Sequence, residues 1–190
     1  MIRLLWVDCE TTGLDPVKND IIQLAGILEI PGIKLEEFNF KVAPLDYETI
    51  TKEAMDCNKI ETSDLRNFPP AFQVHLEFKQ LLFKWCNPFD PTTKLILCGQ
   101  NVQFDSNFIQ NFCEKQGDKF WRACVTSGAF DLKTLSVAYE IHRKKKIFKS
   151  YSLGSICETL GVKLTNAHDA MADIKATREC CLEIWNGIIK

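Results

Sequence analysis

Apolar runs separated by turn residues mark the first part of the chain. Segment 2–7 is almost entirely bulky and apolar, which predicts a buried strand. The apolar, β-rich run 21–30 ends at Pro31-Gly32, and 34–44 predicts the strand that returns beside it. These three segments predict an antiparallel meander with short connections.

Strand and helix patterns alternate in the remainder. KLILC (94–98) predicts a second buried strand, and a fifth short strand is expected to end within FDLKTL (130–135). Helices are predicted in 50–66 (capped by Thr62 or Ser63), 71–85, 102–116, 132–142, 152–160 and 168–188. The last helix has a predicted core-facing stripe of Ala170, Ile174, Thr177, Cys181, Trp185 and Ile188. The order predicts one α/β domain over 1–190, a mixed sheet packed by helices.

Composition narrows the class of partner. The chain is 46% hydrophobic and 25% charged, with a formal net charge of -2. This balance excludes a global electrostatic attraction to nucleic acid or to a membrane, so a polyanion must be met by a local patch or by bound metal. No apolar stretch approaches the roughly 18 residues that span a bilayer, so we expect no membrane association.

Cysteine usage indicates the redox environment. The chain has 9 cysteines, an odd number, and several lie within apolar patterns. No CxxC pair occurs, so a structural zinc site is not expected. We also expect no signal peptide before the cysteines. We expect reduced, buried thiols in a soluble cytoplasmic protein.

Carboxylates follow the first strand. Asp8 and Glu10 are one residue apart, so both side chains point to one face of the strand while Cys9 points to the other. Like charges held together indicate a bound cation or proton transfer. Asp105 falls early in the helix after KLILC, and His168 and Asp173 are expected at the start of the last helix.

These residue types suit phosphodiester chemistry. Mg²⁺ and Mn²⁺ take oxygen ligands, and two such ions roughly 3.5–4 Å apart stabilise the attacking and leaving oxygens of a phosphodiester. Carboxylates from three separate segments are about what two ions require. A nearby histidine can take a proton from the attacking water.

The motifs together resemble a known family. DCETTGLD, NVQFD, and SLGSICETLGV followed by NAHDAMADIKAT are similar to the three exonuclease motifs of the DnaQ-like, DEDDh 3′→5′ exonucleases. The resemblance implies a ribonuclease-H-like fold, with a five-stranded mixed sheet in which a three-strand antiparallel meander joins two parallel strands. It also implies hydrolysis of terminal phosphodiesters of single-stranded nucleic acid, with release of nucleoside 5′-monophosphates.

The resemblance assigns roles residue by residue. Asp8 would bridge two divalent cations, Mg²⁺ or Mn²⁺, with Glu10 and Asp173 completing the tighter site and Asp105 supporting the second. His168 matches the general base, because the histidine subclass places this residue five positions before the last aspartate. The sister branch has a tyrosine where this chain has Asp169.

Substrate contacts are also implied. Thr11 and Thr12 match a turn whose backbone meets the terminal nucleotide, and Leu14 matches an apolar wedge against terminal bases. Ile60 resembles a second apolar contact, and Asn101 matches a polar residue before the phenylalanine-aspartate pair. Gln100 departs from the family, since relatives often have histidine there.

A basic run precedes the last motif. Lys144, Lys145 and Lys146 lie in RKKKIFK (143–149), close to Phe148 and Tyr151. Such runs are usually solvated faces. Alternatively, the lysines and stacking aromatics hold the backbone of a single strand.

Several alternatives stay open at this stage. We favour DNA over RNA as the substrate, while an exoribonuclease or oligoribonuclease of the same family shares the motifs. A haloacid-dehalogenase-like phosphatase is a further alternative, but it would require an aspartate at position 10, where this chain has Glu10. A non-catalytic nucleic-acid-binding adaptor usually loses ligands, which this chain retains. A homodimer and a polymerase partner are both compatible with the resemblance.

Overall fold

The computed structural model describes residues 1–189, and within this range five strands form one sheet in the order β3-β2-β1-β4-β5. The strands are β1 (Leu4–Thr11), β2 (Ile21–Ile30), β3 (Lys34–Lys41), β4 (Leu95–Gly99) and β5 (Val125–Asp131). β2 pairs antiparallel with β1 and β3, whereas β4 pairs parallel with β1 and β5. The predicted antiparallel meander and two parallel strands are confirmed.

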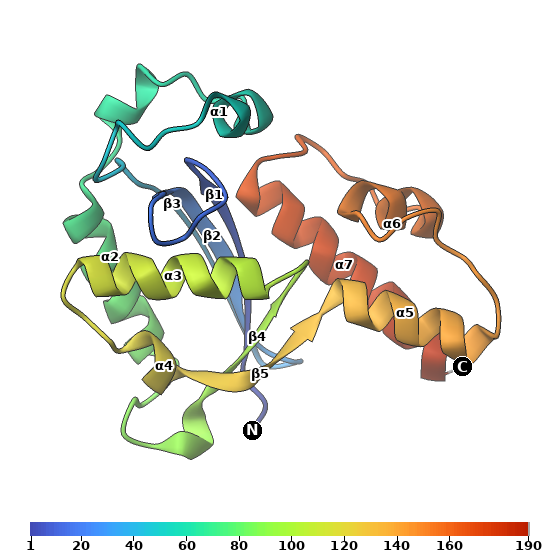
Figure 1. The fold of residues 1–190 in the computed structure, drawn as a ribbon. Helices are drawn as coiled ribbons and strands as arrows, with labels where there is room; N and C mark the ends of the chain where they lie inside the picture. Colours follow the sequence, from blue (N-terminus) through green and yellow to red (C-terminus); the bar gives the residue numbers. More distant parts are fainter. Residues whose placement is uncertain (190) are drawn as a thin grey trace.

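Helices cover both faces of this sheet. They are α1 (Lys52–Asn58), α2 (Ala71–Phe83), α3 (Gln103–Lys115), α4 (Trp121–Cys124), α5 (Leu132–Arg143), α6 (Leu153–Leu160) and α7 (Ala170–Ile189), with short 3-10 helices at Asp64–Asn67 and Pro91–Thr93. Figure 1 shows α2, α3 and α4 on one side of the sheet and α5, α6 and α7 on the other, while α1 lies beyond the carboxyl end of β1.

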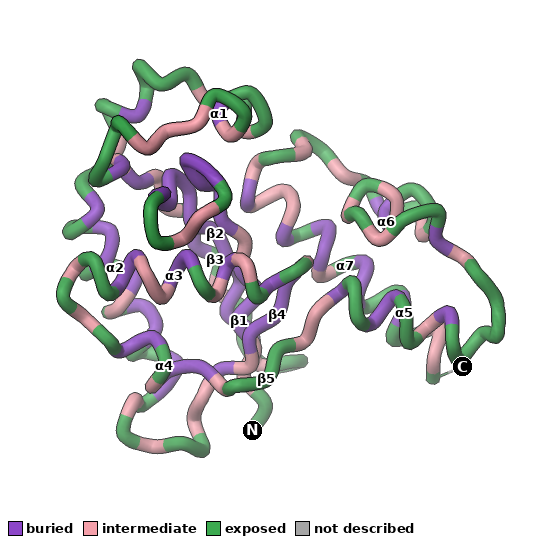
Figure 2. The backbone as a smooth tube through the Cα atoms, viewed as in Figure 1, coloured by how far each residue is buried: buried purple, intermediate pink, exposed green. Residues whose placement is uncertain are grey.

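The alternation along β1 divides the core into two clusters. Leu5, Val7 and Cys9 pack into the cluster formed with α2 and α3, whereas Trp6 packs into the cluster formed with α5, α6 and α7. Figure 2 shows β1 and β2 as the most continuously buried part of the chain. Because strand side chains alternate, Asp8 and Glu10 share the α7 side with Trp6, as their spacing predicted.

Two local predictions are only partly right. Ser63 occupies the N-cap position of the 3-10 helix at Asp64–Asn67 but makes no side-chain cap bond, whereas α1 is capped by Thr51, whose side chain accepts from the Ala54 amide. In α7, Trp185 is 50% exposed while Cys180 and Ile184 are buried. The other predicted stripe residues are buried or packed on the core, so Trp185 alone is wrong. The buried face is wider than the stripe because α7 packs against β1 and β2 and also against α5 and α6.

The thiols are largely as predicted. All the cysteines are free, and each except Cys57 is buried. Cys57 is exposed on α1 because it faces the space between α1 and α7 rather than the core. Among residues 1–189, the helices are too short or too polar to cross a bilayer.

Candidate active site

Three carboxylates meet at the carboxyl end of β1. Asp8 and Glu10 come from the strand and Asp173 comes from the first turn of α7. One oxygen of each carboxylate lies within 4.8 Å of the others. Segments more than 160 residues apart in sequence therefore place their acidic groups at one point, as predicted.

Asp105 approaches the same point from the other face of the sheet. It lies in the first turn of α3 and is only 3% exposed. Its Oδ1 accepts a hydrogen bond of 2.9 Å from the backbone amide of Cys9, the residue between the two acids of β1. This bond fixes α3 to the strand end, and Asp105 lies close enough to Asp8 to perturb its ionisation.

Burial makes this cluster costly to ionise. It raises the pKa of Asp8 well above its usual range, with Asp105, Glu10 and Asp173 adding repulsion. Burial raises the pKa of Asp105 to about 8, against the hydrogen bond from Cys9. Burial and the charges of Asp173 and Asp169 raise the pKa of Glu10 to about 7. Nearby positive charge would restore the ionised forms.

The donor set fits hard divalent cations. Asp173 Oδ1 is buried without a hydrogen-bond partner, while its Oδ2 accepts from the His168 amide at 3.2 Å. A buried carboxylate oxygen without a partner indicates a missing ligand. Since the cluster offers only oxygens, it suits cations such as Mg²⁺ rather than thiophilic metals.

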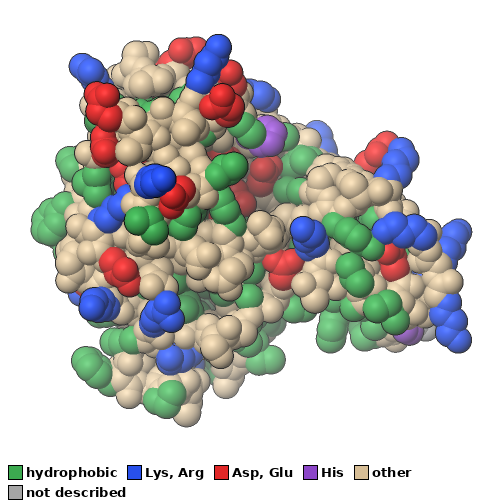
Figure 3. All heavy atoms as spheres, in the orientation of Figure 1, with side chains coloured by type: hydrophobic (Ala, Val, Ile, Leu, Met, Phe, Trp, Pro, Cys, Tyr) green, Lys and Arg blue, Asp and Glu red, His purple; other side chains and the backbone are tan. Residues whose placement is uncertain are grey.

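His168 lies just before α7 rather than within it. Its backbone has φ 71°, in the left-handed region, and its side chain is exposed. The ring Nδ1 lies 3.5 Å from Cys57 Sγ, so the imidazole reaches toward α1 across the site. In Figure 3 acidic side chains gather in a hollow beside an exposed histidine, between the surface over α1 and that over the start of α7.

The start of α7 is held to the sheet. Asp169 precedes the helix, and its Oδ1 accepts from the Ala172 amide at 3.1 Å. Its Oδ2 accepts from Gln23 Nε2 at 3.2 Å. Gln23 is buried on β2, so β2 helps to set the positions of His168 and Asp173.

A cavity of about 620 Å³ opens beside the carboxylates. Its lining includes Glu10, Thr11, Leu14, Cys57, Asn58 and Phe104. Leu14 is 83% exposed at the rim, which leaves its side chain free to contact a ligand. The volume is in the range of small-ligand sites, and the mixed lining suits a nucleotide with a base and a charged end.

Thr12 and Asn101 lie outside this lining. Thr12 is fully buried, and its amide, carbonyl and hydroxyl bond to Asp20 and Thr51. It therefore shapes the turn, whereas Thr11 meets the cavity. Asn101 has φ 57° in the turn before α3, where its carbonyl accepts from Phe104.

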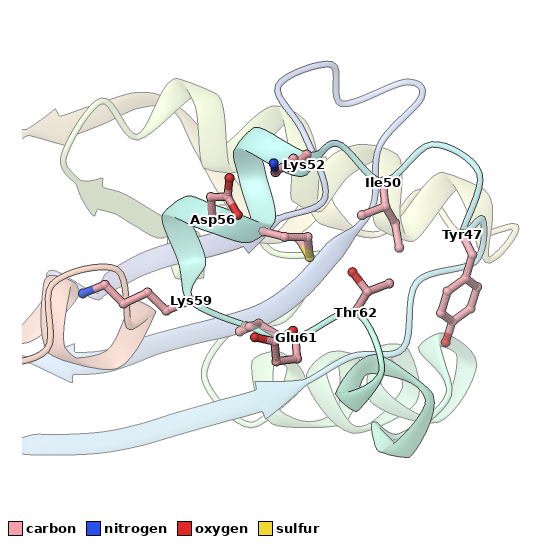
Figure 4. Close-up of a pocket in the computed structure, with 9 residues that line it drawn as sticks. Tyr47, Ile50, Lys52, Asp56, Lys59, Glu61 and Thr62 are labelled. Carbon is pink, nitrogen blue, oxygen red and sulfur yellow. The ribbon is translucent and has the colours of Figure 1, made fainter.

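Ile60 lies away from Leu14. It lines a second cavity of about 600 Å³ on another side of α1, shown in Figure 4 with Lys52, Asp56 and Glu61 around it. It also borders a smaller cavity of about 220 Å³ that contains His168. The structure thus places Ile60 in the same cavity as His168 and not beside Leu14.

The predicted lysine run lies far from the carboxylates. Tyr139 of α5 packs against Gly187 of α7, and α7 extends about 20 Å from Asp173 to Gly187. Lys144 follows α5, beyond Tyr139 (Figure 1). Phe148 is 1% exposed in the core, so the expectation that it stacks on bases is wrong.

Sequence reasoning missed several residues at the site. Phe104 stands within the NVQFD motif, and this position next to Asp105 was a usable signal. Cys57 and Asn58 end a short helix with no chemical motif, although the Asn58 amide donates to the Thr11 carbonyl at 2.9 Å. Gln100, the departure from the family, donates to the Tyr151 carbonyl at 2.6 Å and ties the start of α3 to the loop before α6.

Comparison with known proteins agrees with this geometry. The RNase T family model, described as exonuclease, matches residues 5–180. The chain is 29% identical over 182 residues to DNA polymerase III subunit epsilon of Aquifex aeolicus, covering 94% of this chain and 78% of the relative. It is 25% identical over 176 residues to the PolC-type DNA polymerase III of Thermotoga petrophila. That match covers 93% of this chain but only 11% of the polymerase.

Solved structures share the fold. Exonuclease I of E. coli in complex with a dT13 oligonucleotide aligns with TM-score 0.75 at 22% identity, over 96% of this chain and 41% of that chain. A complex of Exonuclease I described as ExoI/SSB-Ct gives 0.78 at 19% identity, over 98% and 41%. The sheet and its flanking helices are therefore those of an exonuclease fold.

Proposed function

This chain belongs to the exonuclease family of enzymes, and we propose that it is a metal-dependent 3′→5′ exonuclease acting on single-stranded nucleic acid. The observation that carries the proposal is the meeting of Asp8, Glu10 and Asp173 within 4.8 Å, beside a cavity large enough for a nucleotide. A fold alone would not support an activity, whereas this arrangement brings three of the predicted acidic side chains to one point.

The carboxylates would hold two divalent cations, Mg²⁺ or Mn²⁺, with Asp105 supporting the second. When bound, such cations supply charge stabilisation for the attacking and leaving oxygens of the phosphodiester. The buried Asp173 Oδ1 without a partner supports this assignment. The protein's own part is to hold four carboxylates at one end of the sheet against their mutual repulsion.

His168 would act as the general base. Its exposed imidazole takes a proton from the attacking water, whose oxygen bonds to the phosphorus as the scissile bond to the 3′ oxygen breaks. The leaving 3′ oxygen takes up a proton to become the new 3′-hydroxyl. A nucleoside 5′-monophosphate leaves, and the strand is one nucleotide shorter. Because the His168 amide donates to Asp173, the base and a carboxylate of the cluster keep a fixed relation.

The cavity supports a single-stranded 3′ end. Leu14 at the rim would wedge against the terminal base, and Phe104 offers a ring on which a base can stack. We propose DNA in preference to RNA, because the curated relatives are DNA polymerase III proteins and the Exonuclease I structure holds a dT13 oligonucleotide. The same relatives support a polymerase as a partner of this chain.

A gel time course tests the proposal. Matched 5′-labelled single-stranded DNA and RNA are incubated with Mg²⁺, Mn²⁺ or EDTA. We expect a ladder that shortens by one nucleotide at a time from the 3′ end, faster on DNA and absent with EDTA. A faster RNA ladder would reassign the substrate, and a bound but intact strand would indicate the adaptor instead.

A further inference from the structure

Lys41 lies in register with Glu10 of β1, two strands away in the sheet. It is the last residue of β3, directly opposite Gln23 of β2, which is in turn opposite Glu10 of β1. Residues directly opposite in a sheet project to the same face. Lys41 therefore projects to the α7 face, and it lines the cavity of about 220 Å³ together with His168 and Asp169.

The ammonium group of Lys41 has a cation–π approach to the ring of Phe68 but no bonded partner in the part of the chain that the structure describes. Within residues 1–189 it makes no hydrogen bond and no ion pair within 4.0 Å, and the ring of Phe68 is 5.8 Å away. Asp169 already accepts bonds from Gln23 and Ala172. Burial lowers the pKa of Lys41, while Asp169 and Glu10 act in the opposite direction. A half-buried cation without a bonded partner is costly, which indicates that an anion from outside completes it.

We propose that Lys41 binds the phosphate of the terminal nucleotide at the edge of the carboxylate cluster. This role rests on the proposed exonuclease function. The phosphate is the anionic part of a strand end, and the cavity that Lys41 lines extends to His168, the proposed base. Lysine is a compact point charge that suits a phosphate oxygen. Lys41 is thus expected to hold the phosphate both before cleavage and in the released monophosphate.

The test measures binding rather than turnover. Thymidine 5′-monophosphate and thymidine are titrated by calorimetry into wild type, Lys41→Met, Lys41→Gln and Lys41→Arg, with saturating Mg²⁺. The matched control is Lys34→Met, at the opposite end of the same strand, where Lys34 lies 3.7 Å from Glu36. Thermal melting confirms that each variant is folded.

We expect Lys41→Met and Lys41→Gln to weaken monophosphate binding by roughly tenfold or more, since a hydrogen bond to a charged group is removed. Lys41→Arg should retain most of the affinity, and thymidine binding and Lys34→Met should be unchanged. Equal monophosphate affinity in wild type and both neutral variants overturns the proposal. So does tighter Mn²⁺ binding by Lys41→Met with unchanged monophosphate affinity, which would make Lys41 a counter-charge for Glu10 and Asp169.

Failure of the exonuclease proposal is visible separately. It would show as wild-type protein that leaves every labelled strand intact, whatever the binding data say. An active wild type whose monophosphate affinity does not depend on Lys41 rejects only the role of Lys41.

Discussion

Glu10 and Glu29 are two glutamates of the same pair of strands, and each is 8% exposed. Glu29, on β2, accepts two hydrogen bonds from Arg178, at 2.8 and 2.6 Å, and one of 3.0 Å from the Trp6 indole. The bonds from Arg178 hold the pKa of Glu29 below its usual range. Within the described residues the Glu10 side chain accepts no such bond; burial and the charges of Asp173 and Asp169 raise its pKa to about 7. Lys41 opposes this shift only in part.

The comparison of Glu29 with Glu10 shows that a buried carboxylate can serve either the framework of the fold or a ligand site. At the Leu4 end of β1 the fold supplies the partner of Glu29, so the carboxylate is complete and helps to attach α7 to β2. At the other end the fold supplies several acids, and the nearby Lys41 makes no ion pair with them among residues 1–189. Buried charge that the protein leaves uncompensated marks a site for an external ligand, whereas a paired one is part of the framework.

Removing a carboxylate charge at the carboxyl end of β1 should lower activity more than any other change considered. We expect Asp8→Asn to lower exonuclease turnover by at least about a hundredfold, because charge stabilisation of the reacting oxygens is lost. The metal-free variant should melt at the same or a higher temperature than wild type, since a repelling carboxylate is gone. Paired turnover and melting measurements check this, and normal turnover would remove Asp8 from the mechanism.

His168 lies at the same end but is exposed, so its removal should not affect folding. We expect His168→Ala to lower the turnover rate by about 10²–10⁴-fold, the usual contribution of a general base. Strand affinity should change little, because the base acts in the chemical step. His142→Ala, an exposed histidine of α5, is the matched control and should retain full activity. A turnover rate in His168→Ala equal to that of the control would exclude the base role.

Removing Arg178 should leave Glu29 a buried carboxylate without a bonded cation, as Glu10 is. We expect Arg178→Met to lower the free energy of unfolding by about 3 kcal/mol, the lower end for such pairs because a quarter of the arginine is exposed. Denaturant unfolding measures this effect. The double variant Arg178→Met with Glu29→Gln should recover part of the loss, because no unpaired charge remains. Equal stabilities of the single and double variants would contradict this view of the pair.

The two glutamates should respond to pH with opposite signs. Below its ordinary pKa of 4.5, Glu10 is protonated in both the folded and unfolded states; between 4.5 and about 7 only the unfolded state ionises. Stability of the metal-free protein should therefore fall as pH rises through this window, by on the order of 3 kcal/mol from Glu10 alone. Glu29, with its lowered pKa, contributes stability that is lost only as pH falls below 4.5.

Thermal melting in EDTA from pH 5 to 8 checks the window. Glu10→Gln is the control that should make the fall shallower, while Asp8 and Asp105, whose pKa values are also raised, keep part of it. Added Mn²⁺ should raise the melting temperature more at pH 8 than at pH 5, because protons compete with the cation for the carboxylates. A melting temperature that rises from pH 5 to 8 without metal would contradict the cost that we assign to ionising these buried carboxylates.

The two ends differ in how well the sequence predicted them. The meeting of Asp8, Glu10 and Asp173 could be predicted, because alternation in a strand is a local signal and the order of the three motifs resembles a known family. Pairing of Glu29 with Arg178 was not predicted, since it joins residues that only the packing of α7 on β2 brings together. The same holds on a smaller scale for the core of α7. Trp185 satisfies the helical period but is half exposed, whereas packing of α5 and α6 on α7 also buries Cys180 and Ile184, which lie outside the predicted stripe.

The lysine run also contains both paired and unpaired charges, here positive ones. Substitutions in it should give the smallest functional effect. Lys146 is compensated, because it donates to Glu140 at 3.2 Å and to the Tyr151 hydroxyl at 2.8 Å. Lys144 and Lys145 make no ion pair among residues 1–189. We therefore expect the double variant Lys144→Ala, Lys145→Ala to weaken strand binding a few-fold. The slope of log affinity against log salt should fall by roughly 1.4, about 0.7 for each lysine that no longer neutralises a phosphate.

Strand length makes this prediction specific. α7 extends about 20 Å from Asp173 to Gly187, where Tyr139 of α5 packs, and the run follows the end of α5. Only a strand long enough to extend past the cavity can therefore reach the run. The double variant should thus bind a long oligonucleotide less tightly than wild type does, and a short one that ends near the cavity equally well. Lys146→Ala should change the slope less than either of the other two lysines, because Glu140 already balances its charge. A salt slope unchanged in the double variant would return the run to an ordinary solvated surface.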